Sequence, residues 1–187
     1  MNEDIKKAIE VLKQGGIILY PTDTSWGIGC DATNEEAVEK LYAIKQRDKS
    51  KSMLILLDNP VKVQTYINDV PEIAWDLIDL AEKPLTIIFN EAKNLAPNLI
   101  NKDGTIGIRI TAEDFSRNLC MRFRKPIVST SANIAGQEAP LNFNQIDPQI
   151  IDLVDYVVEY RQDEFYKQTP SSIIKLGNSG EIDIIRK

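Results

Sequence analysis

The chain contains no histidine. This absence excludes Ser-His-Asp and Cys-His catalysis and histidine-containing zinc sites, and it removes the commonest general base near neutral pH. Only two cysteines occur, Cys30 and Cys120. They are too few for a structural zinc site, and their wide separation suits free thiols in a reducing compartment. An enzyme of this composition has to work by positioning and charge, or with carboxylate and lysine chemistry.

Long apolar runs and a surplus of positive charge are also missing. No apolar stretch approaches the length that spans a bilayer, and the N-terminus lacks the basic start and apolar core of a signal peptide. We therefore expect a cytoplasmic protein without a membrane partner. The net charge of -6 argues against nonspecific coating of nucleic acid, although it permits a local basic cleft. The 187 residues suffice for one well-buried domain, predicted to span 1–187.

Residues 15–31 have the features of a binding loop. An apolar run over 17–20 ends at Pro21, four hydroxyl or carboxylate side chains follow over 22–25, and glycines stand at 27 and 29. Proline ends a strand ladder, and glycine lets the backbone approach a ligand closely. The alternative interpretation is a strand, a turn and a second strand whose polar residues merely solvate the turn.

Hydrophobic periodicity predicts one mixed α/β domain, because helices and strands are interspersed without strict alternation. Thr33 and Glu36 form a predicted capping box, and Thr111 is expected to cap a later helix. The predicted helices cover residues 2–14, 33–45, 60–67, 71–80, 111–123 and 144–153. The predicted strands cover residues 17–20, 53–57, 84–90, 104–110, 126–130 and 155–159, with a C-terminal hairpin formed by 171–176 and 181–187.

The segment 45–51, KQRDKSK, holds four cations and one aspartate at a predicted helix C-terminus, where cations are favoured. In an extended segment Lys45 and Arg47 would point the same way and could hold one polyanion together. We then expect Lys45→Ala or Arg47→Ala to abolish turnover with the fold intact. The alternative is an ordinary solvated basic turn.

Polar side chains also stand at several predicted strand ends. Arg109 ends the apolar run 105–108, where it is either an outward surface residue or a bidentate partner for a carboxylate or phosphate. Residues 129–133 (STSAN) and 169–172 (TPSS) are rich in hydroxyls. Such residues cap turns, or they hold phosphate and carbonyl oxygens. Gathered beside the cationic segment, they would form one anion pocket.

Five segments together resemble the Sua5/YciO/YrdC family over nearly the whole chain. They are YPTDTSWGIG at 20–29, Lys45-x-Arg47, TIGIR at 105–109, STSANIAG at 129–136 and PSSII at 170–174. The resemblance implies an α/β fold with a twisted, mixed, largely antiparallel sheet, flanked by helices around a basic cavity. Active members are threonylcarbamoyl-AMP synthases, which join L-threonine, bicarbonate and ATP and release pyrophosphate. The implied partners are these substrates, Mg²⁺, and a tRNA threonylcarbamoyl transferase complex that receives the product.

The same resemblance implies a set of site residues without any metal-ligating side chain. Catalytic roles fall on Lys45, Arg47, Ser131 and Asn133. Contacts with the nucleotide fall on Lys51, Thr105 and Arg186. Contacts with threonine fall on Thr22 or Thr24, Arg109, Ser129 and Ser171.

Two departures from the family pattern keep other interpretations open. Asp48 replaces the proline common after Lys-x-Arg, and Trp26 stands where tyrosine or phenylalanine is usual. A YciO-like paralogue is therefore one alternative, and an RNA-binding module that uses the same basic cavity is another. The extra C-terminal domain of the longer Sua5 branch is missing, which predicts a minimal single-domain member.

Overall fold

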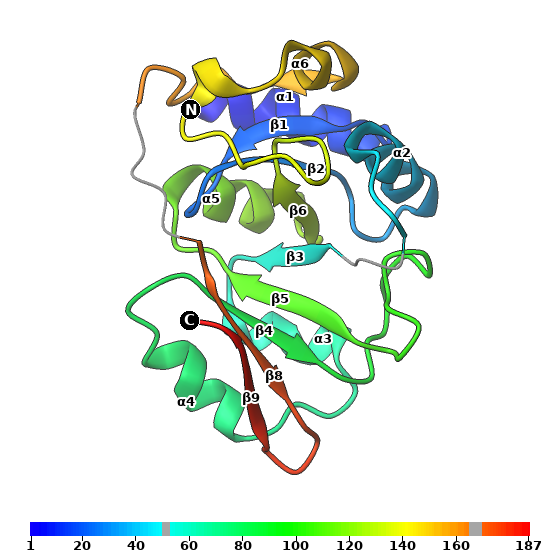
Figure 1. Ribbon diagram of the computed structural model, residues 1–187, viewed down its shortest axis with the longest axis vertical. Helices are drawn as coiled ribbons and strands as arrows, with labels where there is room; N and C mark the ends of the chain where they lie inside the picture. The colour runs from blue at the N-terminus through cyan, green and yellow to red at the C-terminus, as the bar shows by residue number, and fades with distance from the viewer. Residues whose placement is uncertain (50–52, 165–169) are drawn as a thin grey trace.

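A twisted sheet organises the computed structural model, which describes residues 1–49, 53–164 and 170–187 (Figure 1). Its strands lie in the order β7-β1-β2-β6-β3-β5-β4-β8-β9. The pairs β1–β2, β2–β6, β3–β6, β4–β5 and β8–β9 are antiparallel, whereas β1–β7, β3–β5 and β4–β8 are parallel. The predicted mixed, largely antiparallel sheet is confirmed. The strands are β1 (Ile18–Pro21), β2 (Trp26–Gly29), β3 (Leu54–Leu57), β4 (Leu85–Phe89), β5 (Ile106–Ile110), β6 (Ile127–Ser131), β7 (Tyr156–Val157), β8 (Ser172–Leu176) and β9 (Ile182–Arg186).

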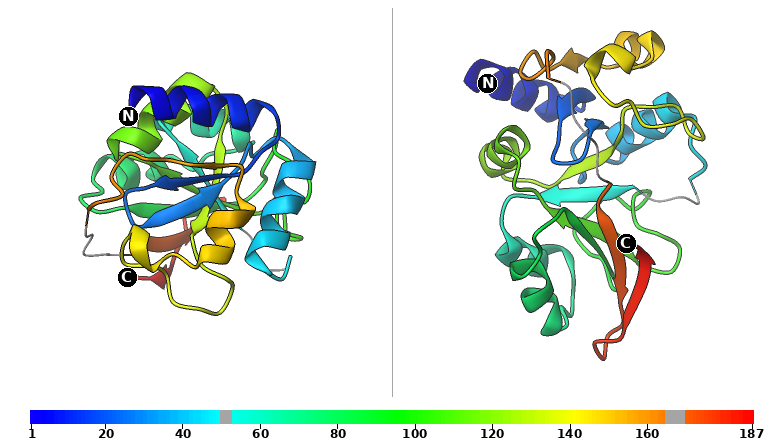
Figure 2. Two further views of the ribbon diagram at one scale, coloured as in Figure 1. Left: turned by 90° about the horizontal axis from the view of Figure 1, so that it is seen from above. Right: turned by 60° about the vertical axis from the view of Figure 1, so that its left-hand side comes forward.

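Helices flank this sheet. Helices α1 and α5 pack together on one side of β1 and β2, and α6 lies on the other side (Figure 2). The predicted helix 144–153 is divided in two, since Pro148 begins a new helix. The helices are α1 (Asn2–Lys13), α2 (Glu35–Lys45), α3 (Val63–Tyr66), α4 (Ile73–Asp79), α5 (Asp114–Phe123) and α6 (Pro148–Leu153), with 3-10 turns η1 (Pro60–Lys62) and η2 (Phe143–Gln145).

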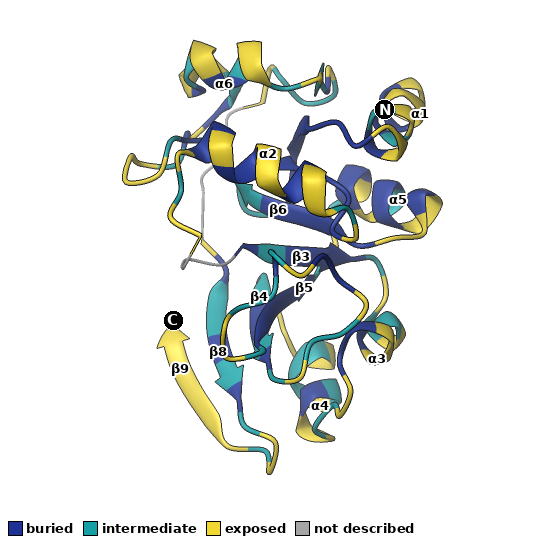
Figure 3. Ribbon diagram, turned by 90° about the vertical axis from the view of Figure 1, so that its right-hand side faces the viewer, coloured by how far each residue is buried: buried dark blue, intermediate teal, exposed yellow. Residues whose placement is uncertain are grey.

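The core lies where these helices meet the central strands. In α1 the apolar residues Ile5, Ala8 and Leu12 recur at helical spacing and are fully buried. Strands β1 and β2 are buried along their whole length, whereas β9 is exposed at the sheet edge (Figure 3). The buried centre therefore fixes the strands from which the functional side chains project.

The N-terminus of α2 differs from the predicted capping box. The cap is Asn34, whose Oδ1 accepts a hydrogen bond from the Ala37 amide at 3.0 Å. The Thr33 hydroxyl instead donates to Asp31 Oδ1 at 2.6 Å. The prediction that Thr33 caps this helix was wrong, because the neighbouring carboxylate takes its hydroxyl and the amide one residue later can cap equally well.

The N-terminus of α5 also differs from the prediction. Its cap is Glu113, whose carboxylate accepts hydrogen bonds from the amides of Phe115 and Ser116 at 3.1 and 2.7 Å. The Thr111 hydroxyl lies 2.7 Å from the Ser116 hydroxyl, so it supports the first turn from the side. The prediction that Thr111 is the cap was wrong by two residues.

Within the described ranges, no helix combines the length and the apolar character that a bilayer crossing requires.

Candidate functional site

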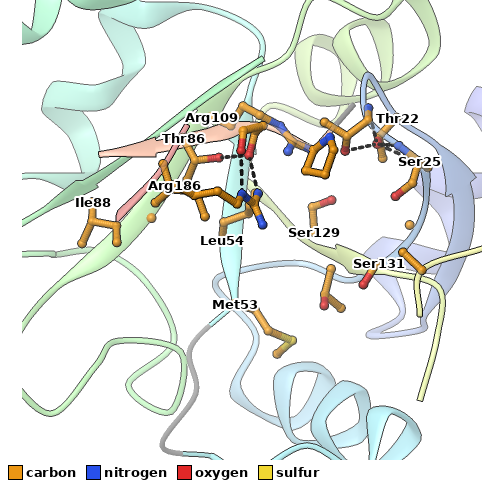
Figure 4. Close-up of a pocket in the computed structure, with 18 of the residues that line it drawn as sticks. Thr22, Ser25, Met53, Leu54, Thr86, Ile88, Arg109, Ser129, Ser131 and Arg186 are labelled. Carbon is orange, nitrogen blue, oxygen red and sulfur yellow. Dashed lines mark hydrogen bonds between the residues drawn. The ribbon is translucent and has the colours of Figure 1, made fainter. Parts of the chain in front are cut away.

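An open cavity of about 370 Å³ lies over the sheet, and residues from distant parts of the chain line it (Figure 4). Hydroxyls and arginines dominate the polar part of the lining, and a few aliphatic side chains complete it. The lining consists of Thr22, Thr24, Ser25, Gly27, Arg47, Met53, Leu54, Thr86, Ile88, Gly107, Arg109, Ser129, Thr130, Ser131, Ala139, Pro170, Ser171, Ile173 and Arg186.

Strand register builds the floor of this cavity as two rows that run across the strands. Side chains of directly paired residues project from the same face of a sheet, so paired positions share one surface. The first row runs from β6 to β4 and consists of Ser129, Leu54, Gly107 and Ile88. The second runs from β5 to β9 and consists of Arg109, Thr86, Ile173 and Arg186. Every one of these residues lines the cavity.

Gly107 adds no side chain to the middle of the first row, so the cavity floor is low there. A Cβ there would lie 3.3 Å from the Leu54 Cβ and 3.4 Å from the Thr86 Cγ2. Such contacts are tight without forcing the strands apart, so a larger side chain at this position would rise into the cavity.

The turn between β1 and β2 forms one wall, and Thr22 holds that turn together. Its hydroxyl donates to the Ser25 carbonyl at 2.6 Å and accepts from the amides of Thr24 and Ser25, each at 3.2 Å. Thr22 is buried, whereas Thr24 is partly exposed. The hydroxyl cluster predicted to bind ligand therefore also uses one of its members to shape the loop.

A second group of hydrogen bonds joins β4, β8 and β9 at the opposite wall. The Arg186 guanidinium donates to the Ser171 carbonyl at 2.9 Å and to the Ser171 hydroxyl at 3.2 Å. That hydroxyl lies 3.0 Å from the Thr86 hydroxyl. Thr86 was not predicted as a site residue, since one threonine in the apolar run 84–90 gives no local signal of a ligand.

Lys45 lies behind the cavity wall. It is the last residue of α2, only 1% exposed, and Gln46 follows it in a left-handed C-cap. The predicted extended geometry of Lys45 and Arg47 is therefore wrong. The Lys45 ammonium donates to the carbonyls of Ser131 and Asn133, each at 2.5 Å, and to Asn133 Oδ1 at 3.1 Å. Burial, with Arg47 close by, lowers the pKa of Lys45 to about 8.

The same hydrogen bonds fix the loop after β6. The Ser131 hydroxyl donates to Asn133 Oδ1, and Asn133 Nδ2 donates to the Gln137 carbonyl at 2.6 Å. Ser131 faces the cavity while Asn133 is buried beneath it. Lys45 and Asn133 thus orient a wall residue from the protein interior.

The structure brings most of the predicted site residues to one surface. Those that line the cavity are Thr22, Thr24, Arg47, Arg109, Ser129, Ser131, Ser171 and Arg186. Thr105 is buried outside this lining and its hydroxyl donates to Asp103 Oδ1 at 2.7 Å, so its predicted contact with the nucleotide stays a prediction. Lys51 lies outside the described residues.

Charge and donor chemistry limit what this cavity can bind. Its described lining holds Arg47, Arg109 and Arg186 and no carboxylate, so it suits an anion. In the part of the chain that the structure describes, no group of three or more histidine, cysteine or acidic side chains could hold a metal ion. The lining thus does not fit a resident Mg²⁺ site, which takes oxygen ligands that include carboxylates.

The two cysteine thiols lie in the protein interior. Cys30 and Cys120 are both buried, and both are free, as predicted. Burial raises the pKa of each thiol, so neither is a thiolate near neutral pH.

Comparison with known proteins agrees with this geometry. The Sua5/YciO/YrdC family model, described as "Telomere recombination", matches residues 10–187. A threonylcarbamoyl-AMP synthase of Pseudoalteromonas translucida is 35% identical over 181 residues, which cover 95% of each chain.

Two solved structures share the fold. E. coli YciO superposes with a TM-score of 0.86 at 23% identity, covering all of this chain and 90% of that one. P. abyssi Sua5 in complex with L-threonine superposes with a TM-score of 0.81 at 22% identity over 92% of this chain. This chain spans about half the length of that Sua5 chain. The extent of the family match shows that the chain belongs to the Sua5/YciO/YrdC family.

Proposed function

We propose that this chain is an L-threonylcarbamoyladenylate synthase. It joins L-threonine, bicarbonate and ATP, and the product passes to a tRNA threonylcarbamoyl transferase complex in the cytoplasm. The observation that carries the proposal is the floor of the cavity, where Arg109 and Arg186 end a row of directly paired residues. Two cations at the ends of one floor suit substrates that carry a carboxylate and a chain of phosphates.

The reaction fits a cavity without a protein nucleophile. The amine of threonine adds to bicarbonate, which gives a carbamate and releases water. A carbamate oxygen then attacks the α-phosphorus of ATP in line, the bond to the β-phosphate breaks, and pyrophosphate leaves. The nucleophile belongs to the substrate, so the protein supplies alignment and charge neutralisation.

Each wall of the cavity has a role in this scheme. Arg109 binds the threonine carboxylate, and the nearby hydroxyls of Thr24 and Ser129 line the space for its polar side chain. Arg47 and Arg186 neutralise the phosphates of ATP. Lys45 acts from the interior by holding the loop that carries Ser131. The P. abyssi Sua5 structure with L-threonine and the identity to a named synthase support threonine as a substrate and the synthase activity.

Mg²⁺ enters this proposal with the nucleotide. Because the described lining offers no carboxylate ligand, the ion would be held by phosphate oxygens and water. When bound, it would neutralise phosphate charge, and the arginines supply the remaining positive charge at the walls.

Pyrophosphate release tests the proposal. The purified protein is given ATP, with L-threonine and bicarbonate each present or withheld, and with L-serine replacing threonine in a further set. Release that requires both co-substrates and weakens with serine is expected.

Two other outcomes would contradict the proposal and point elsewhere. ATP binding without threonine-dependent release would favour a YciO-like paralogue. Absence of ATP binding, together with RNA affinity that falls steeply with salt, would favour an RNA-binding module.

A further inference from the structure

A buried ion pair lies at the end of β5, next to the cavity. Arg109 Nη2 is 3.1 Å from Asp23 Oδ1, and the two side chains are only 5% and 10% exposed. Asp23 belongs to the turn between β1 and β2, so the pair joins two segments that are far apart in the sequence. An ion pair this well buried fixes the direction of both side chains, because separating it would leave a charge without compensation.

The two partners face different spaces. Arg109 lines the main cavity, whereas Asp23 is absent from that lining and contributes to a second, largely apolar cavity of about 260 Å³. The second cavity lies on the far side of the pair, where Ile108, Ile110 and Lys83 also line it. Asp23 thus contacts the arginine from behind, away from the space in which a substrate would lie.

The pair is held by charge and packing, without hydrogen-bond geometry. Asp23 Oδ1 and Arg109 Nε are both enclosed by protein, and neither has a hydrogen-bond partner in the described structure. Nε is therefore closed to the cavity, and Arg109 faces a ligand there through its remaining atoms. Burial raises the pKa of Asp23 while the Arg109 charge opposes that rise, and Glu113 is a further negative charge nearby.

We propose that Asp23 is a positioning residue for substrate binding: its buried carboxylate pairs with the Arg109 guanidinium and holds it where it lines the cavity, ready to bind the carboxylate of the amino-acid substrate. This inference rests on the proposed function for the identity of that substrate. Asp23 does not touch substrate itself. It acts only through Arg109, and it keeps a buried cation compensated when the cavity is empty.

A double-mutant cycle tests this role. Asp23→Asn, Arg109→Gln and the double variant are compared for the KM of threonine, the KM of ATP and kcat. Asp23→Asn is expected to raise the KM of threonine roughly 10- to 100-fold, with the KM of ATP changed less than about twofold. In the Arg109→Gln background the same change is expected to add less than about twofold, because Asp23 then has no arginine to position. Equal, additive losses in both backgrounds would overturn the inference.

Two further measurements keep the test independent of folding and of the proposed activity. Asp58→Asn is the matched control, since Asp58 is also 10% exposed and ion-paired, with Lys62 at 2.7 Å, but lies outside the lining. Its KM of threonine should equal that of the wild type. Hydrogen exchange of the Arg109 Nε–H, followed by NMR, should be slow in the wild type and in Asp58→Asn and fast in Asp23→Asn.

The outcomes separate the two proposals. A wild type without threonine-dependent turnover defeats the proposed synthase activity, while the exchange experiment still tests the pair. Unchanged exchange in a folded Asp23→Asn variant overturns the positioning role whatever the activity. If Asp23→Asn alone fails to fold, the double variant is compared with the wild type, because it removes both charges. Restored folding in the double variant supports the pairing. Folding that is still lost refutes the pairing.

Discussion

Replacing Lys45 by methionine tests whether the buried ammonium supports the loop after β6. The substitution keeps most of the side-chain volume and removes the hydrogen bonds to the Ser131 and Asn133 carbonyls and to Asn133 Oδ1. Those acceptors are buried or half-buried, so they lose partners that water does not readily replace. We expect a folded variant whose free energy of unfolding is lower by about 1–3 kcal/mol near neutral pH.

The difference in unfolding free energy between the wild type and Lys45→Met depends on pH, because the pKa of Lys45 is lowered to about 8 in the folded protein. The ordinary pKa of lysine is about 10.4, so between these values the unfolded chain binds more protons than the folded one. Wild-type stability therefore gains a contribution from Lys45 as pH rises through this window. Between pH 7.5 and 9.5 the wild type should gain about 2 kcal/mol relative to Lys45→Met.

Urea unfolding at the two pH values measures this difference, and circular dichroism follows the transition. Lys40→Met is the control, because Lys40 lies on the exposed face of the same helix. Its difference from wild type at each pH is the baseline for the comparison. A Lys45→Met difference from this baseline that does not change with pH would refute the inference that burial shifts the pKa of Lys45.

Three further substitutions test the sheet that carries the cavity. Gly107→Val should weaken ATP binding about tenfold, and Gly107→Ala should weaken it less, because the larger side chain extends further from the cavity floor. If calorimetry gives both variants the wild-type affinity for ATP, this floor is not the binding surface. Gly29→Ala should lower the free energy of unfolding by about 3 kcal/mol, since its Cβ would lie 2.1 Å from the Val128 carbonyl oxygen; a wild-type urea midpoint would show that β2 and β6 separate without cost. Thr86→Val should lower the free energy of unfolding in urea by about 1 kcal/mol, because the Ser171 hydroxyl loses a partner, and it should raise the KM of threonine. If neither value changes, the Thr86–Ser171 pair has no such role.

Local sequence signals predicted the elements well where periodicity was clear. The apolar spacing of α1 and the apolar runs of β3, β4 and β6 each located an element within a few residues. Helix caps were predicted less well, because several residues near each N-terminus can cap and the choice depends on neighbours. Asn34 caps α2 since the Thr33 hydroxyl is already bound to Asp31, a contact that the capping-box pattern does not reveal.

Site residues could be predicted from the sequence where a polar side chain lies at the end of a predicted strand. Arg109, Ser129 and Ser171 were predicted in this way, because a polar side chain after or before an apolar run marks the rim of a sheet, and all three line the cavity. Thr86 was missed, since its hydroxyl becomes meaningful only when β8 places Ser171 beside it. Lys45 was recognised, but as a ligand contact and not as the buried support that the structure shows.

The amino-acid sequence alone shows which chemical groups this protein has available: no histidine, a cationic segment after a helix, and several hydroxyl-rich strand ends. Composition and local patterns carry that information because they depend on neighbouring residues only. Tertiary structure decided which of these groups meet. The order and register of the strands place Arg109, Thr86, Ile173 and Arg186 in one row, and packing buries Asp23 against Arg109. Both depend on contacts between residues distant in the chain, which no local pattern encodes.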